Sequence, residues 1–149
     1  IFEGRNASRV AKEFSERVWL SWTNRGHQPD QLPSTEALSK AVDFSIEADV
    51  ECTLINCSHA DMASNSIKEL KRASRFGIFA NSSTFKEVDL SVATKDVDAI
   101  HHLNSEEISA KEYAMIALSW AKEGAFVVGG CCGTTVEHTR EIKLLMDSL

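Results

Sequence analysis

Two short apolar runs that end near cysteines, each followed by a helical pattern, restrict the fold of this chain more than any other feature. The first run, residues 50–55, leads directly into Cys57. The second, residues 125–128, ends in two glycines just before Cys131 and Cys132. Runs of this length without polar alternation are typical of strands buried on both faces of a parallel sheet. The sequence therefore predicts an α/β fold with cysteines just beyond two strand ends.

The same alternation of strand and helix extends along the whole chain. Apolar residues with a helical period separate the runs, so each predicted strand is followed by a helix. Polar turn residues and capping boxes mark several of the boundaries, including Ser109 with Glu112 and Thr134 with Glu137. We predict strands at residues 18–23, 50–56, 76–80 and 125–130, and helices at about 7–17, 33–49, 60–74, 109–124 and from 135 onward.

The position of the three thiols predicts a metal site. Strand ends of one polarity meet on one face of a parallel sheet or barrel, so Cys57, Cys131 and Cys132 should converge there. The N-terminus of the following helix favours thiolate, and three thiolates without a fourth protein ligand suit a catalytic zinc ion. Apolar packing, a vicinal disulfide, a closed structural zinc site and a thiol-redox module remain alternatives. Cys52 lies at the opposite end of its strand, where we expect it to pack in the core.

Several motifs together resemble the homocysteine S-methyltransferase family, whose members bind zinc. The resemblance is carried by "INCS" and "GGCCGTTVEH", and "VWLSWT" and "GIFANSS" are similar to two further strands of that family. It implies that Cys57, Cys131 and Cys132 bind Zn²⁺. The opening "IFEG" resembles a strand end whose carboxylate binds the amino group of homocysteine, which assigns Glu3 to substrate binding. Asn81, at the end of "IFAN", is the second candidate substrate contact.

The resemblance implies a fold larger than this chain. Family members are (β/α)₈ TIM barrels, which typically need about 250 residues, whereas this chain has 149. We therefore interpret residues 1–149 as a single partial homocysteine-binding domain: the C-terminal half of a barrel, with four parallel strands and with the N-terminal half absent. Two strand edges would then stay unpaired, so we expect the fragment to be inactive alone and to self-associate or be poorly stable.

The implied activity is zinc-dependent methyl transfer from a sulfonium or betaine-type donor to homocysteine, which gives methionine. No catalytic group beyond the metal is expected. Residues 81–84 read Asn-Ser-Ser-Thr where many family members have Asn-Ser-Gly-Glu, so the identity of the methyl donor stays open. Two alternatives stay open as well: a non-catalytic structural zinc or thiol-redox module, and the homocysteine module of a larger cobalamin-type methionine synthase.

Charge and composition narrow the partners to small molecules. The formal net charge is -6 and the one basic cluster, "KELKR", lies on a predicted helix, which argues against nucleic acid and anionic membranes. No apolar stretch approaches the roughly 20 residues that span a bilayer. Four cysteines arranged for metal rather than for pairing fit a reducing compartment, so we predict a cytoplasmic protein. The sequence does not specify an oligomeric state.

One segment, residues 82–109, is too long for an ordinary strand-to-helix connection of about 2 to 6 residues. It shows no regular pattern, and we expect it to fold over the active face. His101 and His102 lie within it, but adjacent histidines point in different directions and three thiolates already suffice for the metal. We assign these two histidines no role.

Overall fold

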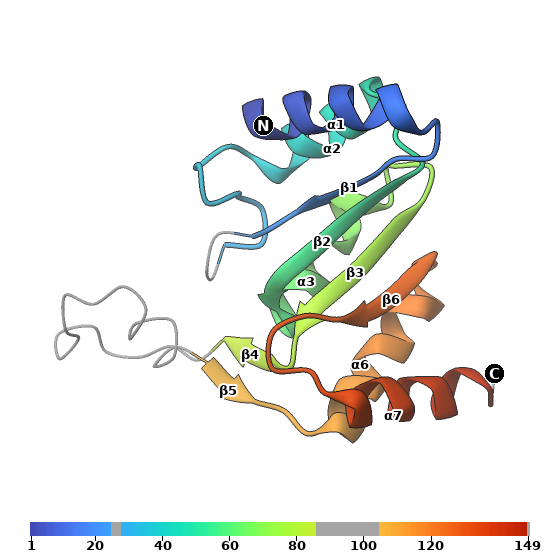
Figure 1. The fold of residues 1–149 in the computed structure, drawn as a ribbon. Coiled ribbons are helices and arrows are strands. Elements are labelled where there is room, and N and C mark those ends of the chain that lie inside the picture. Colours follow the sequence, from blue (N-terminus) through green and yellow to red (C-terminus); the bar gives the residue numbers. More distant parts are fainter. Residues whose placement is uncertain (25–27, 86–104, 149) are drawn as a thin grey trace, which may run out of the picture.

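A computed structural model describes residues 1–24, 28–85 and 105–148 (Figure 1). Its main sheet has four strands in the order β1-β2-β3-β6, and every neighbouring pair is parallel. This confirms the predicted α/β arrangement and all four predicted strands. The strands are β1 (Trp19–Trp22), β2 (Cys52–His59), β3 (Phe76–Asn81) and β6 (Val127–Gly130).

Helices alternate with these strands, and they bury the apolar faces that the sequence pattern indicates. In Figure 1, α3 and α6 lie behind the sheet, and α1 and α2 lie beside β1. The largest fully buried side chains come from helices and strands alike: Trp120, Tyr113, Leu38, Ile55, Leu70 and Ile78. The helices are α1 (Phe2–Phe14), α2 (Leu38–Glu47), α3 (Ala60–Asn65), α4 (Ile67–Leu70), α6 (Ala110–Lys122) and α7 (Val136–Met146).

The helix expected over residues 60–74 is divided into α3 and α4 at Ser66. The hydroxyl of Ser66 donates to the carbonyl of Met62, four residues earlier, and it also accepts from the side-chain amide of Asn24. A hydroxyl that bonds back to the helix and outward to another segment competes with the regular helical pattern. The prediction of one continuous helix was therefore wrong, although Ile67 and Leu70 are buried as expected.

The amino-terminal helix also differs from its prediction. We expected a strand end before Glu3 and a helix over residues 7–17, whereas α1 runs from Phe2 to Phe14 and includes Glu3 in its first turn. A carboxylate is favourable there because the first turn carries partial positive charge. Helix α1 packs closely on β1, since a Cβ atom added to Gly4 would collide with the ring of Trp22.

The segment after β3 has more regular structure than expected. Strands β4 (Ser83–Phe85) and β5 (Ser105–Glu107) form an antiparallel pair, which Figure 1 shows beyond the end of β3. The backbone N–H of Phe85 donates to Asp61 Oδ1 of α3 and so holds this pair against the main domain. Short polar strands such as these carry little periodicity that a sequence pattern can reveal. His101 and His102 lie outside the described residues.

The caps of the last two helices were predicted with different success. Ser109 and Glu112 form the expected capping box at the start of α6, and Gly124 ends that helix region with a φ of 97°. At α7 the capping residues are Thr135 and His138 instead of Thr134 and Glu137. Thr134 instead donates its hydroxyl hydrogen to the carbonyl of Cys131. Either of two adjacent threonines can cap a helix, so the sequence alone does not distinguish them.

Aromatic side chains bridge the two open edges of the sheet. Adjacent strands lie about 4.8 Å apart, so the two edges of a flat four-stranded sheet would be about 14 Å apart. Trp19 of β1 and Phe126, just before β6, nevertheless make an edge-to-face contact with centroids 6.2 Å apart. Among the described strands, β1 and β6 each pair with one neighbour in this sheet. No described helix has the length and apolar character needed to cross a membrane.

Candidate metal centre

Cys57 lies in an irregular part of β2. Its φ is +49°, in the left-handed region that residues other than glycine seldom adopt, and the pairing of β2 with β3 shifts register between Asn56 and His59. Such a bulge breaks the alternation of side chains along a strand and redirects one of them. The exposed Cys57 side chain thereby reaches the carboxyl end of the sheet.

Cys131 and Cys132 lie in the turn between β6 and α7, and the end of β3 holds this turn. The backbone N–H of Cys131 donates to the carbonyl of Ala80 at 2.8 Å, and the N–H of Ser82 donates to the carbonyl of Cys132 at 3.0 Å. Gly133 follows with a φ of 77°, where a Cβ would meet the Ser82 hydroxyl at 2.6 Å. The turn is therefore fixed on both sides of the two cysteines.

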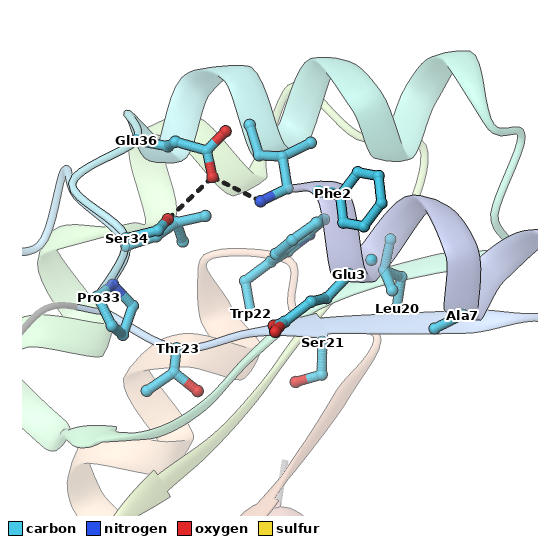
Figure 2. Close-up of a pocket in the computed structure, with 13 residues that line it drawn as sticks. Phe2, Glu3, Ala7, Leu20, Ser21, Trp22, Thr23, Pro33, Ser34 and Glu36 are labelled. Carbon is cyan, nitrogen blue, oxygen red and sulfur yellow. Dashed lines mark hydrogen bonds and ion pairs between the residues drawn. The ribbon is translucent and has the colours of Figure 1, made fainter.

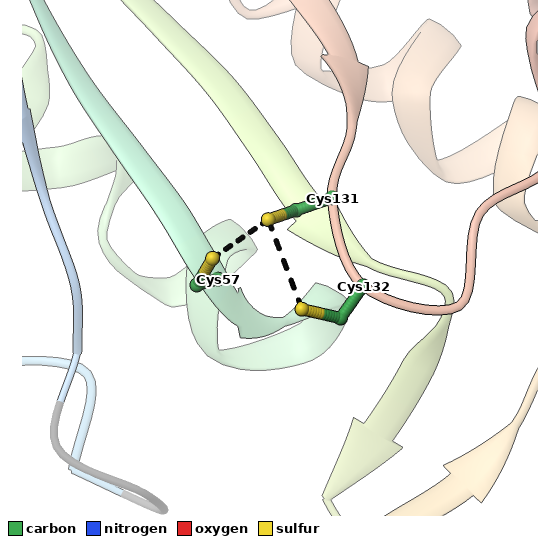
Figure 3. A group of neighbouring side chains, drawn as sticks. All are labelled: Cys57, Cys131 and Cys132. Carbon is green, nitrogen blue, oxygen red and sulfur yellow. Dashed lines mark hydrogen bonds between the residues drawn. The ribbon is translucent and has the colours of Figure 1, made fainter.

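The three thiols converge as the sequence predicts, and Figure 3 shows them pointing toward one another. The sulfur of Cys131 lies 2.6 Å from that of Cys57 and 4.0 Å from that of Cys132, and all three sulfurs are within 4.8 Å of one another. Thiolates bound at about 2.3 Å to a tetrahedral ion lie about 3.8 Å apart. A rotation of Cys57 that separates it from Cys131 by about 1 Å gives this spacing, so the three residues fit a metal ion.

The protonation of the thiols shows why a cation suits them. A hydrogen bond with Cys131, then burial and the negative charge of the other two sulfurs, raise the pKa of Cys57 to about 12. Burial opposes ionisation of Cys131, but hydrogen bonds from Cys57 and Cys132 outweigh it and lower the pKa of Cys131. The hydrogen-bonded pair of Cys57 and Cys131 thus favours a single thiolate, and ionising both of these sulfurs requires a nearby positive charge.

Asn81 contacts this centre through the backbone. Its Oδ1 accepts a hydrogen bond from the N–H of Cys132 at 3.1 Å, while its Nδ2 donates to no described residue. Sequence analysis proposed a substrate contact for Asn81 and did not foresee this link. Asn81 can accept from Cys132 and also donate to a substrate, because its side-chain amide has a separate acceptor and donor.

Tyr113 is a supporting residue that sequence analysis treated only as core. Its hydroxyl lies 2.7 Å from the carbonyl oxygen of Ala80 and 2.8 Å from that of Gly129, so it joins β3 to β6 directly before the two cysteines. Burial and the charge of Cys131 raise the pKa of Tyr113 and keep it a neutral donor. The residue type could have indicated this supporting role in the sequence, because a buried tyrosine usually needs a hydrogen-bond partner for its hydroxyl.

Glu3 lies apart from the thiols and lines a cavity of about 650 Å³ between α1, β1 and the segment after β1. Figure 2 shows its side chain extending from α1 toward β1. The cavity reaches Thr23, whose hydroxyl donates to Asn56 beside Cys57 at 3.2 Å. Its volume falls within the range of small-molecule sites, about 300 to 1,000 Å³.

Cys52 confirms its predicted role in packing. Its side chain is 1% exposed, and burial, then the charge of Glu51, raises the pKa of its thiol to about 11. The metal-ligating candidates in the described part of the chain therefore form one group, made of Cys57, Cys131 and Cys132.

Comparison with known proteins decides the family. A family model described as homocysteine S-methyltransferase matches residues 2–146, nearly the whole chain. The chain belongs to the homocysteine S-methyltransferase family. One curated member, homocysteine S-methyltransferase YbgG of Bacillus subtilis (strain 168), is 26% identical over 152 residues, which is 100% of this chain and 44% of YbgG.

Solved structures agree with this assignment at the level of the fold. The metallated form of the homocysteine methyltransferase MmuM from Escherichia coli gives a TM-score of 0.63 at 18% identity and covers 93% of this chain and 39% of MmuM. The oxidized form of MmuM gives 0.61 at 19% identity, with coverages of 96% and 40%. The chain thus spans about two fifths of the length of these homocysteine methyltransferases, and the comparison confirms the predicted part of a TIM-barrel fold.

Proposed function

We propose that this chain supplies the zinc-binding part of an enzyme that transfers a methyl group from a sulfonium or betaine-type donor to homocysteine, giving methionine. The observation that carries the proposal is the convergence of Cys57, Cys131 and Cys132, with sulfurs within 4.8 Å, at the carboxyl ends of parallel strands. Active sites of parallel α/β barrels lie at this end. Membership of the homocysteine S-methyltransferase family supports the substrate class.

The cysteines have defined roles in this proposal. Cys57, Cys131 and Cys132 would hold Zn²⁺, and within the described residues no fourth histidine, cysteine or carboxylate joins them. That ligand set is typical of catalytic zinc, which keeps one position for water or substrate. When bound, the ion is a Lewis acid that favours the thiolate form of a substrate thiol at neutral pH. No side chain is then needed as a general base.

Two further residues are proposed to bind the amino acid part of the substrate. The Glu3 carboxylate lines the 650 Å³ cavity and has the charge to pair with an ammonium group. Asn81 offers its Nδ2 as a donor, since its Oδ1 is engaged by Cys132. Both assignments are tested by replacing the residue with alanine and measuring homocysteine binding. Binding that is unaffected by Glu3→Ala would remove Glu3 from the site.

The four strands are proposed to work as part of one (β/α)₈ domain. The open edges of β1 and β6 and the coverage of about two fifths of the relatives support this. We expect the 149-residue chain to bind zinc without turnover, because four strands do not enclose a site. We also propose a cytoplasmic location, supported by free cysteines that a reducing compartment preserves.

The experiment has a binding step and a turnover step. Homocysteine is titrated into the zinc-loaded chain by calorimetry in buffers of different ionisation enthalpy. We expect about one proton released per homocysteine near pH 7, because a free thiol with a pKa of about 8.5 is mostly protonated there. A Cys131→Ala variant is the matched control. The absence of both binding and proton release would favour a closed structural zinc site or a redox module.

Turnover is assayed with the chain alone and with the chain fused to the part of YbgG that the alignment does not cover. Sulfonium and betaine donors are screened with homocysteine. We expect methionine from the fused protein with at least one donor, and loss of that activity on chelation of the metal. Methionine formation that persists after chelation contradicts the zinc mechanism, and no methionine from any donor contradicts the methyltransferase proposal.

A further inference from the structure

Asn56 uses both ends of its side-chain amide next to the metal centre. Its Nδ2 donates to the sulfur of Cys57 at 3.7 Å, a normal separation for a sulfur acceptor. Its Oδ1 accepts from the hydroxyl of Thr23 at 3.2 Å. Thr23 directly follows β1, where Trp22 pairs with Ile55, so it lies beside Asn56 in the neighbouring strand. A chain of two hydrogen bonds thus runs from the wall of the cavity to a metal-binding sulfur.

The chemistry of the ligand requires this orientation of the amide. A sulfur that binds a metal has lost its proton, so it attracts an N–H group and repels a carbonyl oxygen. The two ends of an asparagine amide have the same shape, and the chain must select one of them. In the structure the Thr23 hydroxyl donates to Oδ1 and holds the amide with Nδ2 facing the sulfur of Cys57.

Resting on the proposed zinc function of the three cysteines, we infer that Thr23 and Asn56 are positioning residues of the metal centre. Thr23 orients the Asn56 amide, and Asn56 holds and polarises the sulfur of Cys57. Residues that hydrogen-bond to metal ligands typically change metal affinity 10- to 100-fold when they are replaced.

The backbone around Cys57 explains why such support is needed. Its φ of +49° is unfavourable for a residue with a Cβ, so the surrounding structure must hold it. Ser58 donates its hydroxyl hydrogen to the carbonyl of Asn56 at 3.1 Å and accepts from the N–H of Asn24 at 2.9 Å. These bonds fix the backbone of the bulge. Among the described residues of β2, Asn56 is the one whose side chain hydrogen-bonds to the sulfur of Cys57.

Four single substitutions test the inference by zinc affinity, measured in competition with a chelator and by the thiolate-to-metal absorption of the cobalt(II) form. Thr23→Val removes the hydroxyl at nearly constant shape and should weaken binding about 10-fold. Asn56→Asp replaces the donor with an acceptor and should weaken it about 100-fold. Thr23→Ser keeps the hydroxyl and should bind like the original chain. Ser21→Ala removes a hydroxyl two residues before Thr23, in β1 and outside the cysteine group, so this matched control should leave zinc affinity unchanged.

The stability of the metal-free variants provides a second test beside the zinc affinities. Thr23→Val, Asn56→Ala and the double variant are unfolded in urea without metal, and far-UV circular dichroism checks that each is folded. We expect the two changes in stability to be non-additive, because the residues share one hydrogen bond. Wild-type zinc affinity in Thr23→Val and Asn56→Asp, or additive stability changes, would overturn the inference.

The outcome is distinguishable from failure of the proposed function. If homocysteine binding releases no proton but Thr23→Val and Asn56→Asp weaken zinc binding as expected, the methyltransferase proposal fails and the positioning role stands. If homocysteine binds as expected while both variants retain wild-type zinc affinity, the positioning role fails and the methyltransferase proposal stands.

Discussion

Strand β2 carries a cysteine at each end, and the two differ in almost every physical property. Cys52 starts the strand, is 1% exposed and lies within regular parallel pairing. Cys57 lies near the other end, is exposed, has a φ of +49° and contacts the sulfur of Cys131 at 2.6 Å. The same residue type therefore packs in the core at one end of a strand and lies beside two other thiols at the other. Position in the sheet decides the chemistry.

The surroundings of the two ends differ in the same way. At the amino end, the carboxylate of Glu51 accepts hydrogen bonds from Arg17, Arg75 and the indole of Trp19, so its charge is compensated. At the carboxyl end, the thiol sulfurs have neutral partners among the described residues: other thiols, backbone N–H groups and the side-chain amide of Asn56. Clustered thiols without a compensating cation are groups that a metal ion can bind.

The largest expected effect is on metal binding. Cys57→Ala or Cys131→Ala removes one of three ligands, so we expect each to lose stoichiometric zinc, with affinity reduced at least about 100-fold. Cys52→Ala should keep one zinc per chain. Metal analysis after dialysis measures this. Zinc retained in Cys57→Ala and lost in Cys52→Ala would reverse the roles of the two ends.

For the stability of the metal-free fold, substitution of Cys52 should matter more than substitution of Cys57. Cys52→Ser places a hydroxyl in an apolar site, so we expect it to lower the free energy of unfolding by about 1–3 kcal/mol. Cys57→Gly suits a positive φ and should leave the metal-free stability unchanged or raise it by up to about 1 kcal/mol. Urea unfolding of both variants without metal measures the contrast. Equal destabilisation by both changes would show that Cys57 is not held against a backbone preference.

The pH response of Cys52 provides the third contrast. Burial raises the pKa of this thiol to about 11, so its contribution to stability is present below the unfolded thiol pKa of about 8.5 and is lost as pH rises through about 11. In a background with the other three cysteines replaced by alanine, iodoacetamide should modify Cys52 slowly until the pH approaches 11. Urea should remove the protection. Rapid modification of the folded chain at pH 8 would contradict burial of this thiol.

The sequence predicts best the features that depend on one local segment. The four strands follow from their apolar runs, and the convergence of Cys57 with Cys131 and Cys132 follows from parallel pairing. The bulge at Cys57, the division of a helix at Ser66 and the β4–β5 pair depend on partners far along the chain. No local sequence pattern identifies those partners.

The supporting hydrogen bonds of the candidate metal centre escape sequence analysis for the same reason. Tyr113 reaches Ala80 from a helix 33 residues away, and Thr23 reaches Asn56 from another strand. Both residue types are common in a core or at a strand end, so their role is visible only once the register of the strands is known. The exchange of Thr134 for Thr135 as the cap of α7 shows that even a local motif can be ambiguous by one residue.

The smallest expected effect concerns the charged cluster at the amino end. The hydrogen bond from Arg17, then that from Trp19, lowers the pKa of Glu51, so its contribution to stability is present above the unfolded pKa and is lost as pH falls through the folded value. Glu51→Gln should remove a small acid-sensitive part of the stability, and salt should weaken the same part. Acid titrations of stability compare the two chains. Identical acid profiles would show that these pairs contribute nothing measurable.

The central claim is that the carboxyl end of the sheet holds zinc through three cysteines and leaves one position for substrate sulfur. X-ray absorption at the zinc edge measures this directly, with and without homocysteine. We predict three sulfur neighbours and one lighter ligand in the zinc-loaded chain, and four sulfur neighbours at about 2.3 Å after homocysteine is added. A sulfur count that does not change on addition of homocysteine would contradict the account.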